Sequence, residues 1–477
     1  MVTWSQAAIF SPCGRRHLPA CPFSRESIKL MLRAPRSLLF VPALLLALIR
    51  PAAAEVFDAE SFTLPNGLTV VVVENHRAPI VTQMVWYRVG AADEPPGKSG
   101  IAHFLEHLMF KGTATAAPGE FSRLIAANGG NENAFTGRDY TGYWQTVAKD
   151  RLELIMRYEA DRMANLTFDA EDVAAEREVI LEERRARVEN SPAAQLDEAV
   201  MAALFRNHPY GIPIIGWLHE MQGLTQADAR AFYDTWYGPD NAILILGGDI
   251  TVAEARPLVE KYYGPLEPVG APKERVRRSE PPLAAEQRVS LASPQVTEPQ
   301  WSRAYLGPAR LEFAAGELES MQLLAEILGG GPTSRLYRAL VVEQGIAVSA
   351  GAYDRAQALD YTSFHLYAQP RDAATLEELE AAVEAVIQRL KDAGITDAEL
   401  RQAKDRLQAA AILARDAPTT GPRLIGGDLA TGATLEEIQS WPERIEAVTV
   451  EQVNALLRRL LDEKRSVTGY LLPQEPA

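Results

Sequence analysis

The chain has 477 residues, with 63 Asp and Glu against 48 Lys and Arg, and a formal net charge of −15. This acidity argues against nucleic-acid binding, which needs a cationic surface, and favours cationic partners or simply solubility. Two cysteines exclude a fold held by several disulfides, so the core must come from apolar packing, which this length can supply in two or more domains.

The N-terminal segment is predicted to be a secretory signal peptide rather than part of the fold. A short basic region precedes an apolar run over residues 38–49, and an A-x-A pattern ends at Ala54. The run is too short to cross a membrane, which takes about 20 residues. We therefore expect a leader and signal peptide over residues 1–54, with translation starting at Met1 or Met31. The mature chain would be periplasmic or otherwise outside the cytoplasm; the alternative is an uncleaved anchor.

Hydrophobic patterns predict an α+β arrangement in the first half of the mature chain. The Asn66-Gly67 turn precedes a β-branched run, and apolar residues recur at helical spacing between the strand candidates. Expected strands cover residues 68–73, 80–89 and 242–247. Expected helices cover residues 100–110, 118–128, 149–164, 169–189 and 193–204.

Residues 266–285, rich in proline and charge, are predicted to link two domains. Beyond them we expect, in order, a strand at 302–306, helices at 315–328 and from 334, a strand from 361 and a helix at 374–393. This order resembles that of the first half and predicts duplication of one domain. We expect an N-terminal domain over residues 55–265 and a homologous C-terminal domain over 286–477.

The most informative motif is the pentad His103-Phe104-Leu105-Glu106-His107. In a helix, its two imidazoles lie one turn apart on one face, with the Glu106 carboxylate beside them. Neutral imidazoles are good zinc ligands, and a neighbouring carboxylate can accept a proton from a metal-bound water. The spacing therefore predicts one zinc ion per chain, bound by His103 and His107, with Glu106 as the general base.

A third ligand is expected from the acidic helix over residues 169–189. Helical geometry places Val173, Glu176, Ile180 and Glu183 on one face, where two carboxylates among apolar residues need a cation or hydrogen-bond partners. We therefore predict Glu183 as the ligand and Glu176 as a supporting carboxylate that orients a ligand. The alternative is a surface helix whose acidic residues pair only with basic neighbours and water.

These features resemble the inverzincin zinc metallopeptidases of the pitrilysin, insulin-degrading enzyme and mitochondrial processing peptidase family. Glu183 lies 76 positions after His107, and the likeness covers nearly all of residues 56–470, at the size of the short bacterial and mitochondrial members. Further family landmarks are similar to Glu94-x-x-Gly97-x-x-Gly100, Asn131–Thr136, His208–Pro213 and Trp236–Ala242.

The resemblance implies two homologous α+β domains, each an antiparallel sheet flanked by helices, that face each other around a chamber. Only the first would bind zinc. It also implies roles for individual residues: zinc ligands His103, His107 and Glu183, catalytic base Glu106, supporting carboxylate Glu176, and substrate-binding edge-strand residues Asn133, Ala134 and Phe135. The implied activity is hydrolysis of unfolded peptides, which would pair with that edge strand.

The second half departs from the family pattern at two positions. Active single-chain members carry an Arg and, seven residues later, a Tyr that assist the reaction, whereas Val341 and Val348 stand at these positions here. A valine side chain cannot donate a hydrogen bond to an oxyanion. We therefore predict a homologous partner subunit that supplies the missing Arg and Tyr. The alternative is that a nearby Arg or Tyr replaces them in this chain.

Two further functions fit the same sequence. The chain could be a non-catalytic scaffold or peptide-binding subunit of the same fold, although such members typically lose zinc-site residues and this chain keeps them. It could also be a maturase that trims one dedicated small peptide. The sequence predicts neither the natural substrate nor the cleavage preference.

Overall fold

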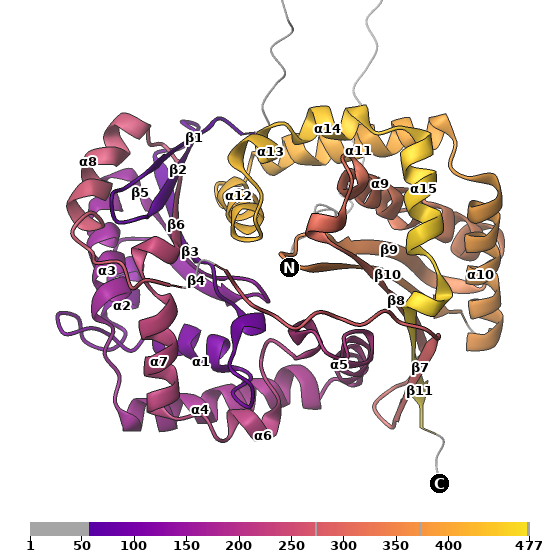
Figure 1. Cartoon of the computed structure of the whole chain (residues 1–477), viewed down its shortest axis with the longest axis horizontal. Helices are drawn as coiled ribbons and strands as arrows, with labels where there is room; N and C mark the ends of the chain where they lie inside the picture. Colours follow the sequence, from indigo (N-terminus) through magenta and orange to yellow (C-terminus); the bar gives the residue numbers. More distant parts are fainter. Residues whose placement is uncertain (1–56, 272–273, 372–373, 475–477) are drawn as a thin grey trace, which may run out of the picture. The chain divides into compact units, whose positions relative to one another are not determined.

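The computed structural model describes residues 57–271, 274–371 and 374–474 (Figure 1). The predicted leader and signal peptide over residues 1–54 lies outside the described residues. Within the described residues, the strands form one six-stranded and one five-stranded sheet, each with its own set of helices. This arrangement confirms the predicted α+β class with two halves, whereas the exact domain boundaries stay predictions.

The first sheet has the strand order β1-β2-β6-β3-β5-β4. Most of its neighbours are antiparallel, but β2 and β6 are parallel, so the sheet is mixed rather than purely antiparallel. A parallel pair needs a long crossover, which the helices between these two strands provide. The strands are β1 (Ala59–Thr63), β2 (Thr69–Glu74), β3 (Ile80–Tyr87), β4 (Asn131–Thr136), β5 (Thr141–Ala148) and β6 (Ala242–Gly248).

Helices cover one face of the first sheet and bury a core of aliphatic and aromatic side chains. Strand residues such as Val70, Val72 and Val85 meet Phe104 and Leu105 of α1 in this core. The helices are α1 (Ile101–Leu108), α2 (Glu120–Ala127), α3 (Leu152–Asn165), α4 (Ala170–Arg184), α5 (Pro192–Leu204), α6 (Leu218–Met221), α7 (Gln226–Trp236) and α8 (Val252–Tyr262).

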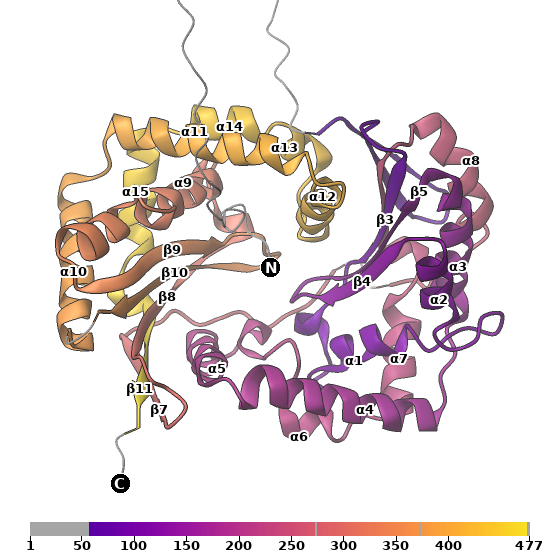
Figure 2. The same cartoon turned by 180° about the vertical axis from the view of Figure 1, so that it is seen from behind.

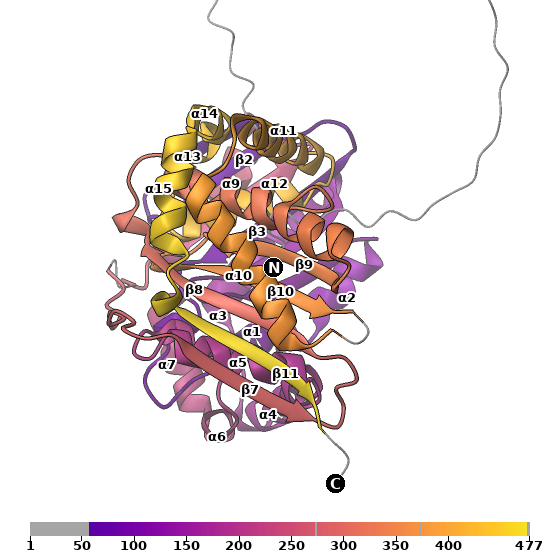
Figure 3. The ribbon, with the colours of Figure 1, turned by 90° about the vertical axis from the view of Figure 1, so that its right-hand side faces the viewer.

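The second sheet has the order β7-β11-β8-β10-β9 and also contains one parallel pair, β7 with β11 (Figure 3). Its strands are β7 (Gln287–Ser293), β8 (Gln300–Ala309), β9 (Ala347–Arg355), β10 (Tyr361–Pro370) and β11 (Ser466–Pro473). Its helices are α9 (Glu317–Gly329), α10 (Leu376–Ala393), α11 (Asp397–Ala414), α12 (Thr420–Ala430), α13 (Leu435–Gln439), α14 (Trp441–Ala447) and α15 (Val450–Leu460).

Each half also receives one helix from the other half on its sheet. Helix α5 of the first half packs its apolar side chains, among them Leu196 and Val200, on β7, β8 and β11. Helix α12 of the second half packs on β3 and β6, and Figure 2 shows it beside β3. Gly426 permits this approach, because a Cβ there would lie 2.1 Å from Cε2 of the buried Trp86. The two halves are thus joined by exchanged helices as well as by the chain between them.

The segment before β7 is bound to both halves through Arg277. Its Nη1 donates to Asp139 at 2.5 Å and to Asp360 at 2.8 Å, and its Nη2 donates to Asp93 at 2.8 Å. Burial alone would lower the pKa of Arg277, but Asp93 and Asp139 outweigh it and raise that pKa. A buried cation with three carboxylate partners fixes this segment, so the predicted linker is not a free tether.

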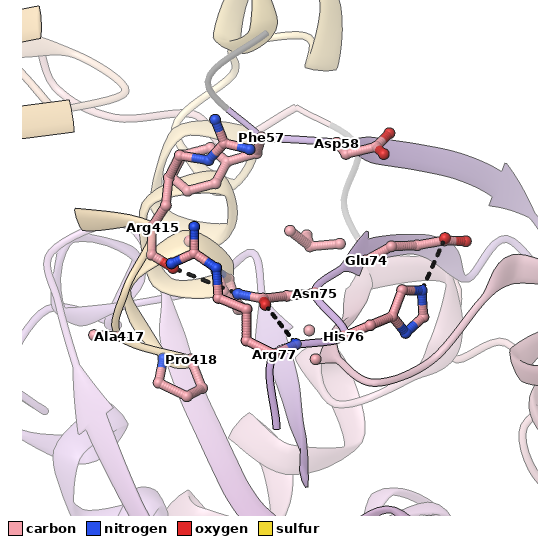
Figure 4. A pocket seen from close by; sticks show the side chains of 14 residues that line it. Phe57, Asp58, Glu74, Asn75, His76, Arg77, Arg415, Ala417 and Pro418 are labelled. Atoms are coloured by element: carbon pink, nitrogen blue, oxygen red, sulfur yellow. Dashed lines mark hydrogen bonds and ion pairs between the residues drawn. The ribbon is translucent and has the colours of Figure 1, made fainter. Parts of the chain in front are cut away.

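A second junction between the halves surrounds a pocket of about 310 Å³ (Figure 4). Asn75, His76 and Arg77, which follow β2, line it together with Arg415 and Pro418 of the second half. Arg77 forms an ion pair with Asp416, and both side chains are exposed. None of the residues predicted to bind metal or substrate lines this pocket, so it lies outside the predicted site.

No helix in the described part of the chain has both the length and the apolar character needed to span a membrane.

Candidate metal centre

The pentad is helical, as predicted, and an acidic residue caps its helix. Gly100, at the N-cap of α1, has a φ of 87°, a left-handed conformation that favours glycine. The Glu94 carboxylate accepts the backbone N–H groups of Gly100 and Ala102, both at 2.9 Å. This cap comes from outside the helix and fixes the direction in which α1 presents its histidines.

The structure brings together His103, His107 and Glu183, the three residues predicted as zinc ligands. One potential ligand atom from each lies within 4.8 Å of the other two. Glu183 Oε2, on α4, is 3.6 Å from His103 Nε2 and 3.3 Å from His107 Nε2. Two imidazole nitrogens and one carboxylate oxygen form a donor set typical of a catalytic zinc site with an open coordination position.

Two observations fit a cation at this point. Glu183 Oε2 is buried and faces the Nε2 atoms of both imidazoles, and a buried negative charge is costly unless a positive charge compensates it. Burial lowers the pKa of His107, but hydrogen bonds to Glu176 and Glu183 outweigh it and raise that pKa to about 9. Without a metal, the carboxylates thus stabilise a proton where a metal ion would supply the positive charge. That these residues bind zinc stays a prediction.

His103 differs from its neighbour in the pentad. Its side chain is almost fully buried, and burial together with the positive field of His107 lowers its pKa. The ring is therefore held neutral, the form in which imidazole coordinates a metal.

Glu176 lies where a supporting carboxylate was predicted. Its Oε1 is 2.8 Å from His107 Nδ1, on the opposite side of the ring from Glu183, and its Oε2 is 2.7 Å from Lys111 Nζ. Hydrogen bonds from His107 and Lys111 outweigh burial and lower the pKa of Glu176 to about 2. An ionised carboxylate at Nδ1 fixes the ring orientation and leaves Nε2 free to coordinate a metal.

The predicted general base, Glu106, is held by a threonine at the end of the edge strand. Thr136 Oγ1 donates a hydrogen bond of 2.5 Å to Glu106 Oε2. Burial raises the pKa of Glu106, whereas this hydrogen bond opposes the shift. A carboxylate with a raised pKa is a better proton acceptor than one free in water.

The predicted substrate-binding residues lie on β4, at an edge of the first sheet. Among the described strands, β4 pairs only with β5. The exposed N–H of Ala134 donates to Asn133 Oδ1 at 2.8 Å, so a side chain rather than another strand satisfies it. The Phe135 ring contacts Trp86 edge-on, with centroids 4.8 Å apart. Strand β4 thus presents a free edge that begins beside Glu106.

Sequence reasoning missed three residues of this centre. Thr136 holds Glu106, Lys111 holds Glu176, and Arg187 pairs with Glu183 Oε1 at 2.7 Å. Arg187 lies four residues after the predicted ligand Glu183, so helical spacing was a signal for this pair. Lys111 lies beyond the end of α1 and contacts a glutamate on another helix, so no local spacing indicated its role. Thr136 ends the segment that resembles the family's edge strand, but only the contact itself reveals its role.

Val341 and Val348, the positions predicted to lack the Arg and Tyr of active members, belong to the second half and not to the candidate metal centre of the first half. Val341 packs partly against the core of the second half, and Val348, near the start of β9, has 45% of its surface exposed. Nearby candidates for replacing the absent Arg and Tyr have other contacts. Arg335 donates to Glu399 at 2.7 and 2.8 Å, and Tyr353 stacks on His365.

Two imidazoles on one helix, a glutamate on a second helix and a carboxylate beside a free strand edge define a candidate centre for metal-dependent hydrolysis. The chain belongs to peptidase family M16. A family model described as "Insulinase (Peptidase family M16)" matches residues 69–217, and one described as "Peptidase M16 inactive domain" matches residues 223–407. The predicted family is thereby confirmed.

Relatives and solved structures agree with this assignment. The uncharacterized zinc protease ML0855 of Mycobacterium leprae is 30% identical over 407 residues, covering 84% of this chain and 89% of the relative. The zinc protease PqqE of Helicobacter pylori is 31% identical over 347 residues, covering 72% and 77%. The crystal structure of a protease from Helicobacter pylori has a TM-score of 0.82 at 28% identity and covers 87% of this chain and 100% of that one.

Proposed function

We propose that this chain is a zinc metalloendopeptidase that hydrolyses unfolded peptides. The observation that carries the proposal is the convergence of His103, His107 and Glu183 beside Glu106, at the free edge of β4. The similarity to relatives named zinc proteases supports the choice of metal.

The chain's own residues divide the chemistry among them. When bound, zinc supplies Lewis-acid chemistry, since it lowers the pKa of a coordinated water to about 7 and polarises a carbonyl group. Glu106 accepts a proton from the attacking water and passes it to the leaving amine. Thr136 keeps the Glu106 carboxylate in place through its 2.5 Å hydrogen bond. Glu176 keeps His107 oriented throughout.

The substrate is held by backbone pairing. An extended peptide that adds to the free edge of β4 gains main-chain hydrogen bonds along Asn133, Ala134 and Phe135. Pairing of this kind accepts many sequences but requires an unfolded segment, and the enclosed chamber implied by the family would exclude folded proteins. General peptide clearance and trimming of one small peptide by a dedicated maturase both fit this geometry.

We further propose that the active form is a heterodimer with a related subunit. The side chains of Val341 and Val348 offer no hydrogen-bond donor, and a homologous partner would supply the Arg and Tyr. The patterns before Ala54 support export to the periplasm or another compartment outside the cytoplasm.

The competing function is a non-catalytic scaffold of the same fold. A family model described as an inactive domain matches residues 223–407, which include the end of the first half and much of the second, and this match is compatible with either function. The intact donor set favours the peptidase, because a scaffold has no need to bring two imidazole nitrogens and a carboxylate oxygen within 4.8 Å of one another.

The decisive experiment compares wild type with Glu106→Gln for zinc content and for cleavage of an unfolded peptide. We expect equal zinc content, measured by elemental analysis, and a loss of at least about 100-fold in rate, the usual contribution of general-base catalysis. A zinc-free wild type, or a variant as fast as wild type, would refute the peptidase proposal.

The heterodimer is tested separately. The mature chain is assayed alone and then with its related subunit, and we expect a large gain in rate on mixing. Full activity of the isolated chain would exclude the need for a partner.

A further inference from the structure

Three residues form a row across the first sheet, on the face that receives α12. Trp86 on β3 lies opposite Gly142 on β5, which in turn lies opposite Phe135 on β4. Gly142 leaves room for the Phe135 ring, because a Cβ there would lie 2.4 Å from Phe135 Cζ. The ring therefore lies inward, over the glycine and toward Trp86. If another strand pairs with the free edge of β4, its residue opposite Phe135 continues this row.

Helix α12 brings a cation from the second half to this row. The guanidinium carbon of Arg423 lies 4.6 Å from the centroid of the Phe135 ring. The helix that carries it is held firmly, because Gly426 sits against Trp86 and Pro422 sits against Gly247. Arg423 is exposed, yet its backbone is anchored to the same sheet that would receive a substrate.

Within the part of the chain that the structure describes, Arg423 has no acidic partner. Across residues 57–271, 274–371 and 374–474, no side-chain hydrogen bond or ion pair satisfies its guanidinium, which lies over the Phe135 ring. Many other arginines of this chain pair with carboxylates, as expected for a protein with a net charge of −15. A guanidinium offers five N–H donors that match a carboxylate, and stacking on an aromatic ring leaves its edge free.

We propose that Arg423 and Phe135 form a subsite that selects an acidic side chain in the peptide substrate. Residues directly opposite each other on paired strands point to the same face of a sheet. The peptide residue opposite Phe135 therefore points to the face where Arg423 lies, and a carboxylate there reaches the guanidinium. The adjacent residue, Thr136, contacts Glu106, so this position is near the scissile bond. This proposal rests on the proposed function, because it assumes that the ligand is a peptide substrate. It does not depend on any property of the metal ion.

The test uses peptide binding, so that it does not depend on catalysis or on a partner subunit. A fluorescent, unstructured, neutral peptide is prepared as a series in which one position at a time is Ala, Asp or Lys. Binding to the Glu106→Gln protein is measured by fluorescence anisotropy, alone and combined with Arg423→Gln, Arg423→Glu or Arg401→Gln. Arg401, another exposed arginine of the second half, is the matched control.

At a single peptide position, we expect Asp to bind about fivefold more tightly than Ala, the scale of a partly exposed ion pair. Arg423→Gln should remove this preference, Arg423→Glu should turn it toward Lys, and Arg401→Gln should leave it intact. Equal affinities for Asp and Ala at every position, a preference that survives Arg423→Gln, or no binding of any peptide would overturn the proposal.

A parallel cleavage assay with the wild-type protein separates this proposal from the peptidase function. Cleavage of the series without any preference for Asp refutes the subsite and leaves the peptidase intact. An Asp preference in binding, with no cleavage even beside the partner subunit, refutes the peptidase and leaves the subsite intact.

Discussion

Replacing Glu176 tests the construction of the metal centre without touching a predicted ligand. Its Oε1 lies 2.8 Å from His107 Nδ1, and its pKa of about 2 keeps it ionised at any working pH. Partners of this kind typically contribute 10- to 100-fold to metal affinity, or about 1.4 to 2.7 kcal/mol. We expect a loss of about tenfold in Glu176→Gln, because the amide oxygen can still accept from Nδ1, and of about 100-fold in Glu176→Ala.

The assay is a zinc titration in competition with a chromophoric chelator, with thermal melting as a check on folding. Glu182→Gln is the matched control, since Glu182 lies on the same helix, is 70% exposed and pairs with Arg185. Glu183→Gln, which replaces a predicted ligand, should lose zinc altogether and gives the largest loss of affinity expected in this series. If Glu176→Ala binds zinc as tightly as wild type while Glu183→Gln does not, His107 is oriented by something other than Glu176.

Two further predictions concern stability. Gly426→Ala should lower the free energy of unfolding by about 1 to 3 kcal/mol, because its Cβ would lie 2.1 Å from the Trp86 ring, whereas Gly223→Ala, with its nearest contact at 3.5 Å, should not; equal urea midpoints would contradict this. Burial raises the pKa of Glu399, but hydrogen bonds from Arg335 and Thr396 outweigh it and lower the pKa from 4.5 to about 2. The ionised Glu399 carboxylate therefore stabilises the folded protein fully above about pH 4.5, and this stabilisation is lost as pH falls toward 2. Arg335→Gln should lower the free energy of unfolding, measured with urea, by about 1 kcal/mol at pH 7 and by almost nothing at pH 2.

The parts of the fold that the sequence predicts are those with strong local patterns. The predicted helix over residues 100–110 corresponds to α1, and the predicted strand at 80–89 corresponds to β3. The acidic helix was expected over 169–189, whereas α4 ends at Arg184 and a π-helical turn follows. Strands β7 and β11 were not predicted, because their pairing joins residues far apart in the chain and leaves little local signal.

In the candidate site, too, features set by local sequence could be predicted, whereas contacts between distant parts of the chain could not. The face of α4 was predictable, because Val173 and Ile180 are buried while Glu176 and Glu183 are half-buried beside them. Glu183 could therefore be selected from several glutamates by helical geometry as the predicted third ligand. The position of Arg423 could not be predicted, since it depends on how a helix of one half docks on the sheet of the other.

The exchange of α5 and α12 has a consequence for how the protein tolerates damage. A single proteolytic cut between the two sheets would not release either fragment. Each fragment would stay bound to the other, because α5 packs on the second sheet and α12 packs on the first. The cleaved protein would elute as one species in size-exclusion chromatography, and its fragments would dissociate only in denaturant.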